Sequence, residues 1–410
     1  MKSLKISAGA KKALIIGALC SVSYLAVYIA RNTLSAVSAQ LTSGGVFDVE
    51  IIGVLSGIYF ACYAIGQLIN GAIGDKIKAK YMISLGLILA GICNAVFPFV
   101  AGELYAVYAI YGISGFFLSM IYGPMTKVVA ENTDPVYATR CSIGYTFASF
   151  FGSPLAGVLA SLMPWNSVFI TASVIMLIMG AVVLVSFTIL EHKGHIQFGK
   201  YKAQKGALSK EGIKTLVKHR IVKFTLISII TGVIRTTVVS LLTLYFAERL
   251  GFTPEGSSTA FTVATLAISC TTFIAVFVYE RLHKNMDLTI LLAFSLAAIF
   301  FILVYFIGDP TANIIFVVLA IMASNSAATM LWSRYCPSLY ETGMVSTATG
   351  FLDFVSYMSA ALASTVFTGL VKSIGWSNLV LIWIGLMLAG IIVALPYHKF
   401  NKNKSLDQAK

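Results

Sequence analysis

Two arginines, Arg31 and Arg235, lie near the middle of long apolar stretches, in the short patterns "IARNT" and "VIRTT". They are 204 positions apart in a chain of 410 residues, which is close to half its length. Each guanidinium presents a planar fork of N–H donors that matches carboxylate or phosphate oxygens. Two such forks could grip one dianion, and a phosphate group carries about −1.5 to −2 charges at pH 7. The pattern predicts an oxyanion site, with phosphate ahead of carboxylate.

Asp353 is the third formal charge that falls well inside an apolar stretch. A charge at the bilayer centre costs about 2.5–3.5 kcal/mol on insertion scales, so such residues usually face a cavity and mark a pathway. A structural ion pair between helices is the alternative, but one acid cannot neutralise both arginines. We expect Asp353 to balance charge by pairing with Arg235 in the empty site. As a proton acceptor it could also permit uniport or proton-coupled symport.

The composition identifies the environment of these charges. The chain is 58% hydrophobic and 11% charged, whereas soluble domains carry about 25% charged residues. A chain so long and so apolar is predicted to be a polytopic membrane protein. The spans contain no histidine, paired carboxylates or nucleophile–base set, so we expect neither an enzyme nor a metal or cofactor site. The six scattered cysteines are interpreted as packing thiols.

Windows of about 20 apolar residues predict twelve membrane-spanning helices. They fall at 13–41, 50–74, 81–100, 104–127, 141–163, 167–190, 222–249, 256–279, 288–308, 311–333, 343–371 and 376–396. The fold class expected is therefore an all-α membrane protein with two pseudo-symmetric six-helix bundles. The predicted domains are 1–190, a cytoplasmic linker 191–221, 222–400, and a cytoplasmic tail 401–410.

The basic residues of the loops predict the orientation, because cytoplasmic loops are enriched in Lys and Arg. Only Arg249 and Lys372 fall in the loops expected outside. Both termini are therefore expected in the cytoplasm, with the protein in the cell (inner) membrane. This topology also explains the net charge of +13, so nucleic acid is not an expected partner. We expect a monomer that meets a small anionic substrate and membrane lipids.

A second repeated feature follows each arginine. Asp75 lies 44 positions after Arg31 in "GAIGDKIKAK", and Glu280 lies 45 after Arg235 in "VFVYERLHKN". Both fall at the turn between the second and third helix of a half. The first motif resembles the loop signature of the major facilitator superfamily, which is a transporter family. The resemblance implies that Asp75 and Lys76 belong to a gating loop and that the substrate site lies near the midplane between the halves.

The chain resembles one branch of that superfamily more closely, the organophosphate:phosphate antiporters. The resemblance covers both halves and is most specific around "YLAVYIARNT", "YAIGQLINGAIGD" and "TATGFLDFVSYMSAAL". It implies that Arg31 and Arg235 bind phosphate. It also implies substrate-binding tyrosines on helices 1, 2 and 11, namely Tyr24, Tyr28, Tyr63 and Tyr357.

Three departures from that branch keep alternatives open. Its helix 2 lysine is replaced here by Gln67, which we retain as a site residue, and its helix 5 histidine has no counterpart. The helix 11 position of Asp353 is normally small and neutral in that branch. The function expected is a secondary active transporter of an organic or inorganic oxyanion by alternating access. The alternatives are a proton-coupled symporter of organic carboxylates and, less favoured, a transporter-like membrane sensor.

Overall fold

The structure is a computed structural model that describes residues 8–74, 77–198, 210–339 and 345–395. Its regular elements are helical throughout these ranges. Asp75 and Lys76, the predicted gating-loop residues, lie outside the described residues.

Six long helices make up the first half of the chain. In order they are α1 (Ala8–Ser43), α2 (Val49–Gly74), α3 (Ala79–Val96) with the 3₁₀ turn η1 (Phe97–Val100), α4 (Leu104–Asn132), α5 (Pro135–Leu162) and α6 (Trp165–His192).

The second half begins with a short helix and contains more interruptions. Its elements are α7 (Lys210–Lys218), α8 (Ile221–Gly232), the π-helical turn η2 (Val233–Val238), α9 (Leu242–Leu244), the π-helical turn η3 (Tyr245–Arg249), α10 (Pro254–Ser269), α11 (Thr271–Arg281), α12 (Met286–Phe306), α13 (Pro310–Met330), the π-helical turn η4 (Leu331–Tyr335), α14 (Cys336–Ser338) and α15 (Val345–Ala394).

The helices agree with the twelve predicted spans. Ten helical stretches within the described residues are long and apolar enough to cross a membrane. One of them, within α15, contains Gly375 with φ 78° and ψ 168°, a non-helical conformation that divides it into two arms. These arms correspond to windows 343–371 and 376–396. The predicted fifth span corresponds to α5, whose described apolar part is the shorter stretch Phe150–Leu162.

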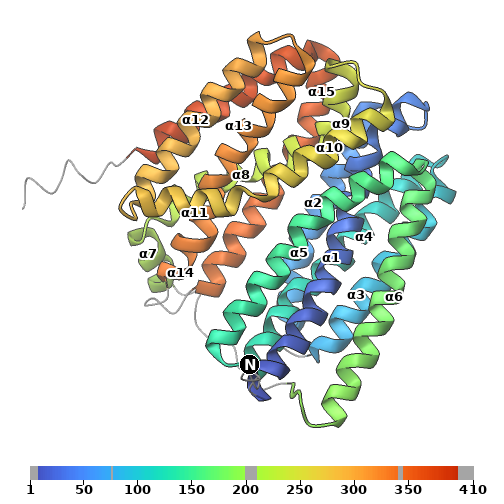
Figure 1. Ribbon diagram of the computed structural model, residues 1–410, viewed down its shortest axis with the longest axis vertical. Helices are drawn as coiled ribbons and strands as arrows, with labels where there is room; N and C mark the ends of the chain where they lie inside the picture. The colour runs from blue at the N-terminus through green and yellow to red at the C-terminus, as the bar shows by residue number, and fades with distance from the viewer. Residues whose placement is uncertain (1–7, 75–76, 199–209, 340–344, 396–410) are drawn as a thin grey trace, which may run out of the picture.

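The helices gather into two groups (Figure 1). In the first group α1 packs on α5, α2 on α4, and α3 on both α4 and α6. In the second, α8 and α12 pack on α15, and α12 packs on α13. The groups meet where α2 contacts α15 and where α5 contacts α10. Helices α2, α5, α10 and α15 therefore form the main contacts between the halves, and α1 also contacts α9 and α10.

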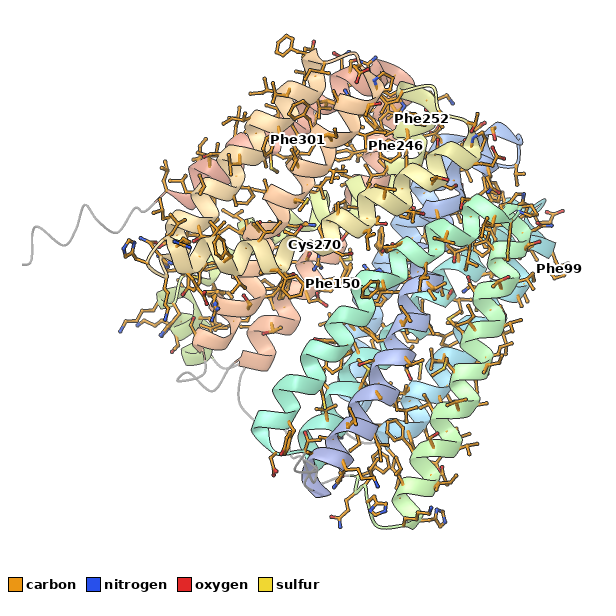
Figure 2. All side chains as sticks on the ribbon, in the orientation of Figure 1. Phe99, Phe150, Phe246, Phe252, Cys270 and Phe301 are labelled. Carbon is orange, nitrogen blue, oxygen red and sulfur yellow. The ribbon has the colours of Figure 1, made fainter. Side chains whose placement is uncertain are left out.

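Side chains sort by environment as a membrane fold requires. Figure 2 labels Phe246 and Phe301 inside the second half, where both are fully buried, and Phe99 at the periphery, where 82% of its surface is exposed. Large apolar side chains such as Leu162 and Ile178 are also exposed. An exposed apolar surface of this extent is suited to lipid contact.

Ion pairs fix the helix ends that the loop charges predict to be cytoplasmic. Glu191 at the end of α6 accepts from Lys78 and from Lys80, each at 2.6 Å, and so ties α6 to the start of α3. The hydrogen bond that Lys78 donates to Glu191 raises the pKa of Lys78. In the second half Asp287 pairs with Arg220 at 3.0 Å and ties the start of α12 to the start of α8.

Candidate substrate-binding site

Arg31 lies in a cluster of aromatic rings in the middle of the bundle. Its guanidinium carbon is 5.5 Å from the ring centre of Tyr28, 5.1 Å from Tyr63, 5.7 Å from Phe60 and 4.7 Å from Tyr357. Aromatic faces within about 6 Å stabilise a cation through the ring quadrupole. The cluster therefore holds a desolvated guanidinium in place, and part of the Arg31 surface remains accessible.

Tyr357 connects this cluster to the second half of the chain. Arg31 Nη1 donates a hydrogen bond of 2.8 Å to the Tyr357 hydroxyl. The Tyr357 ring also contacts Tyr63 at 4.9 Å between ring centres and Phe60 at 6.3 Å. The structure thus brings together four predicted site residues, Tyr28, Arg31, Tyr63 and Tyr357, from α1, α2 and α15.

A second aromatic group adjoins the first through Tyr24. Its ring centre is 5.0 Å from that of Tyr28 on the same helix. It also lies 5.5 Å from Tyr122 on α4 and 6.2 Å from Tyr145 on α5. Tyr24 is buried, whereas Tyr122 is 39% exposed. This group lies nearer than Arg31 to the N-terminal end of α1.

Arg235 lies on the π-helical turn η2 rather than on a regular helix. Such turns insert an extra residue into a helix, and they occur frequently at functional sites. Part of the Arg235 surface is accessible, while the neighbouring Ile234 and Thr236 are buried. Within the described ranges Arg235 makes no hydrogen bond or ion pair, so its donors are available to a ligand.

The predicted ion pair between Asp353 and Arg235 is absent among the described residues. The packing register explains the difference. Ser228 donates to the Leu352 carbonyl, and Thr237 donates to the Ala360 carbonyl. Each residue of α8 and η2 is therefore level with the α15 residue whose number is 123 or 124 higher. Arg235 is thus level with 358–359 of α15, more than one helical turn beyond Asp353. The two side chains interact electrostatically without direct contact.

Ser228, Thr231 and Arg235 follow one another at helical spacing in the seventh predicted span. The spacing predicts that Ser228, Thr231 and Arg235 share one cavity-lining face. Ser228 and Thr231 are instead buried, and Ser228 donates at 2.8 Å to the backbone of α15. The wide turn η2 changes the helical phase at Arg235, which an assumption of regular 3.6-residue periodicity cannot anticipate.

Gln67 lies one helical turn beyond Tyr63 on α2 and is partly accessible. A spacing of four residues places it on the same side of α2 as Tyr63.

The end of the bundle predicted to face outside is closed by contacts between the halves; we call it the outer end. The hydroxyls of Ser38 on α1 and Thr243 on α9 are hydrogen-bonded, and Thr243 donates to the Ser35 carbonyl. Ser258 on α10 donates to the Ala36 carbonyl at 3.0 Å. Arg31 precedes Ser38 by 7 residues, and Arg235 precedes Thr243 by 8 residues. At about 1.5 Å per residue, both arginines therefore lie about 10–12 Å below the Ser38–Thr243 contact, at similar depth.

Glycines permit the close approach of α2 and α15 near the same end. A Cβ at Gly57 would collide with the Thr365 side chain and the Ala361 carbonyl, and one at Gly53 would collide with Thr368.

Lower in the bundle, Ser269 at the end of α10 donates to the Phe150 carbonyl of α5 at 2.8 Å. Figure 2 labels Phe150 and the adjacent Cys270 where these two helices meet.

The sequence did not predict several aromatic residues of these two groups, among them Phe60, Tyr59 and Tyr122. Phe60 precedes Tyr63 by three positions, a spacing that places it on the same side of α2 and could have indicated it. Tyr59 lies one turn before Tyr63, and its buried hydroxyl has no hydrogen-bond partner in the described part of the chain. Tyr122 lies on α4, and only the fold brings it to Tyr24.

Residues 18–364 match the Major Facilitator Superfamily. The chain belongs to this family. The predicted fold of two six-helix bundles, and the major facilitator fold that the loop resemblance implies, are thus confirmed. The nucleoside transporter NupG has a similar structure, with a TM-score of 0.72 at 14% identity over 92% of this chain and 98% of that chain. At this identity the likeness concerns the fold alone.

Two curated relatives within the family match nearly the whole chain. A glycerol-3-phosphate transporter of Bacillus subtilis (strain 168) is 22% identical over 404 residues, which cover 92% of this chain and 90% of the relative. A phosphoglycerate transporter protein of Salmonella typhimurium is 22% identical over 390 residues, which cover 88% and 84%. These relatives agree with the resemblance to organophosphate transporters inferred from the helix 1, 2 and 11 motifs.

Proposed function

We propose that this protein is a secondary active transporter of a phosphate ester or similar oxyanion that works by alternating access. The observation that carries the proposal is the position of Arg31. A cation buried in the membrane-spanning part is contacted by residues of both halves, Tyr63 and Tyr357, while part of its surface stays accessible. A bound anion at this place would contact both halves and could couple binding to their relative motion.

The relatives support transport over the other classes considered. Both are transporters of phosphate compounds, and each matches more than four-fifths of its own length. This breadth favours a transporter over a membrane sensor or an enzyme.

The proposed roles divide between charge and shape. The forks of Arg31 and Arg235 bind the phosphate oxygens, since planar N–H donors match them bidentately. Asp353 offsets part of their charge when the site is empty, because burying uncompensated charge is expensive. The other lining residues orient the substrate through hydroxyl, amide and ring contacts, and these are Tyr24, Tyr28, Tyr63, Gln67 and Tyr357.

The contacts of Ser38 with Thr243 and of Ser258 with Ala36 support a conformation closed at its outer end. In the proposed cycle, substrate binding replaces the hydrogen bond between Arg31 and Tyr357, and the halves then rock until the outer contacts separate. The predicted gating loop at Asp75 and Lys76 would act at the opposite end.

We further propose that the protein is a monomer in the cell (inner) membrane with both termini in the cytoplasm. Its chain divides at 190 and 222 into two bundles joined by a linker. Loops carrying reporter tags, placed at 44–46 and at 193–195, would report opposite sides of the membrane.

A thermal-shift screen of the purified protein tests the proposal, because a ligand that binds the folded state raises its stability by mass action. Inorganic phosphate, glycerol 3-phosphate, a hexose 6-phosphate and small monocarboxylates form the panel. Stabilisation by phosphate compounds, together with their exchange in proteoliposomes, is the expected result. Asp353 favours a second candidate, proton-coupled carboxylate symport. Stabilisation by monocarboxylates alone would select that candidate and reject ours.

A further inference from the structure

Asp353 lies at a different depth along α15 from the contact between Arg31 and Tyr357. Arg31 contacts Tyr357, four residues further along α15, so the acid lies about 6 Å nearer the N-terminal end of that helix than this contact. The register of η2 against α15 places Arg235 level with residues 358–359, close to the same depth as Arg31. The backbone positions of the two arginines therefore lie at similar depth, and that of Asp353 lies at least one helical turn away.

The surroundings of Asp353 combine cations and neutral phenols. Part of its surface is accessible, and no ion pair neutralises it within the described residues. The titratable groups that interact with it electrostatically come from six elements, and they are Arg31, Tyr63, Tyr122, Arg235, Cys336 and Tyr357. Phenol and thiol side chains are neutral near pH 7, so the two arginines and the acid give the site a net charge of +1.

This arrangement is poorly matched to a simple phosphate dianion. Such a ligand would carry about one charge more than the site compensates, and Asp353 would repel it at short range. A ligand whose phosphate is accompanied by an ammonium group corrects both mismatches.

Tyr122, one of the phenols that interact with Asp353, is suited to that ammonium, and its ring packs against that of Tyr24. Tyr24 and Tyr122 lie with ring centres 5.5 Å apart, and the cation–aromatic contacts of Arg31 involve other rings. Aromatic faces beside a carboxylate form a favourable environment for an ammonium ion. Tyr122 keeps 39% of its surface exposed, so a ligand can reach it.

We propose, building on the proposed function, that the preferred substrate is a zwitterionic phosphate ester or phosphonate. Its phosphate binds between Arg31 and Arg235, and its ammonium binds about one helical turn away between Asp353 and Tyr122. A short alkyl chain spans the two levels. Asp353 is then a specificity-determining residue.

The test compares O-phosphoethanolamine with propyl phosphate, which has a methyl group in place of the ammonium. Dissociation constants are measured on the purified protein, with glycerol 3-phosphate as a third ligand. The wild-type protein should bind the zwitterion at least tenfold more tightly than propyl phosphate. Asp353→Asn should reduce that preference at least tenfold by weakening zwitterion binding and strengthening propyl phosphate binding.

Tyr122→Leu provides a second variant, since its partly exposed side chain makes misfolding less of a concern. It should lower the preference for the zwitterion while leaving the affinity for propyl phosphate within about twofold. Asp48→Asn, at an exposed acid of the outer end, is the control and should change neither constant.

The outcomes separate the two proposals. Equal affinity of the wild-type protein for the two probes would overturn the zwitterion inference and leave phosphate-ester transport intact. An unchanged preference for the zwitterion in Asp353→Asn would also overturn the zwitterion inference. So would proton-driven uptake of propyl phosphate by the wild-type protein, if Asp353→Asn loses that uptake. Failure of all three phosphate compounds to bind would reject the proposed function itself.

Discussion

Arg31 and Tyr357 are 326 positions apart in the sequence, yet the guanidinium of the first donates a 2.8 Å hydrogen bond to the hydroxyl of the second. The same guanidinium lies 4.7 Å from the centre of the tyrosine ring. One pair of side chains thus joins α1 of the first half to α15 of the second at the level of the proposed anion site. Occupation of the site and the relative position of the halves are therefore expected to depend on each other.

Replacing Tyr357 with Phe should weaken closure of the outer end. The ring and its packing remain, but one hydrogen bond between the halves is lost, and such a bond to a charged group contributes about 1.5–3 kcal/mol. Spin labels at Ser43 and Glu255, both exposed at the outer end on opposite halves, would report the distance. We expect the population with the long distance to rise at least about fivefold.

The matched control for that variant is Tyr81→Phe, because the Tyr81 side chain is largely exposed. It should leave the distance distribution unchanged. An unaltered distribution in Tyr357→Phe as well would mean that the hydrogen bond does not contribute to closure.

Replacing Arg31 with Lys should reduce transport strongly while the positive charge is retained. A lysine lacks the planar fork and cannot keep both a phosphate and the Tyr357 hydroxyl bonded in the same geometry. Loss of a charge-assisted hydrogen bond corresponds to about a tenfold or greater loss of affinity. Uptake and ligand affinity in proteoliposomes measure the effect, and Arg235→Lys should behave alike.

Arg249→Lys is the control for both arginine variants, since Arg249 is an exposed residue at the outer end of η3. It should transport normally. Normal uptake by Arg31→Lys would remove the basis of the anion site.

Cysteines at positions 38 and 243 should lock the protein when they are cross-linked. The hydroxyls of Ser38 and Thr243 are hydrogen-bonded in this structure, so Ser38→Cys and Thr243→Cys place two thiols within reach. Oxidation should stop transport, and a reductant should restore it. The exposed Cys270 is first replaced by Ser to prevent side reactions.

Each single cysteine variant serves as the control and should be insensitive to oxidation. Full transport by the cross-linked double variant would show that the outer end does not open during the cycle.

Replacing Glu191 with Gln should lower stability without altering the substrate site. Glu191 pairs with Lys80, whose side chain is only 5% exposed, so the variant leaves a nearly buried ammonium without its counter-charge. We expect a loss of about 1.5–3 kcal/mol, seen as a drop of several degrees in the thermal unfolding of the purified protein.

Glu50→Gln is the matched control, because Glu50 and Lys372 form an exposed pair at 3.2 Å. Exposed pairs contribute about 0–1 kcal/mol, so the unfolding temperature should hardly change. Equal effects of the two substitutions would contradict the distinction between buried and exposed pairs.

The sequence determined the architecture and the central charges. Twelve apolar windows specify twelve helical segments, because backbone polar groups within a bilayer must be satisfied internally and a helix does this within one segment. Because burying a charge in a membrane is energetically unfavourable, Arg31, Arg235 and Asp353 could be identified as candidate site residues within apolar stretches. The tyrosines Tyr28, Tyr63 and Tyr357, inferred from the family resemblance, have their rings within about 6 Å of the Arg31 guanidinium.

Only the tertiary structure decided how these groups meet. The π-helical turn at Val233–Val238 changes the phase of Arg235, and the register between α8 and α15 places it more than one turn from Asp353. Tyr24 and Tyr122 lie far apart in the sequence, and only the packing of α1 against α4 brings their rings into contact. Hydropathy and spacing specify which residues lie in the membrane, but packing between helices fixes their relative rotation and height, and these decide which charges touch.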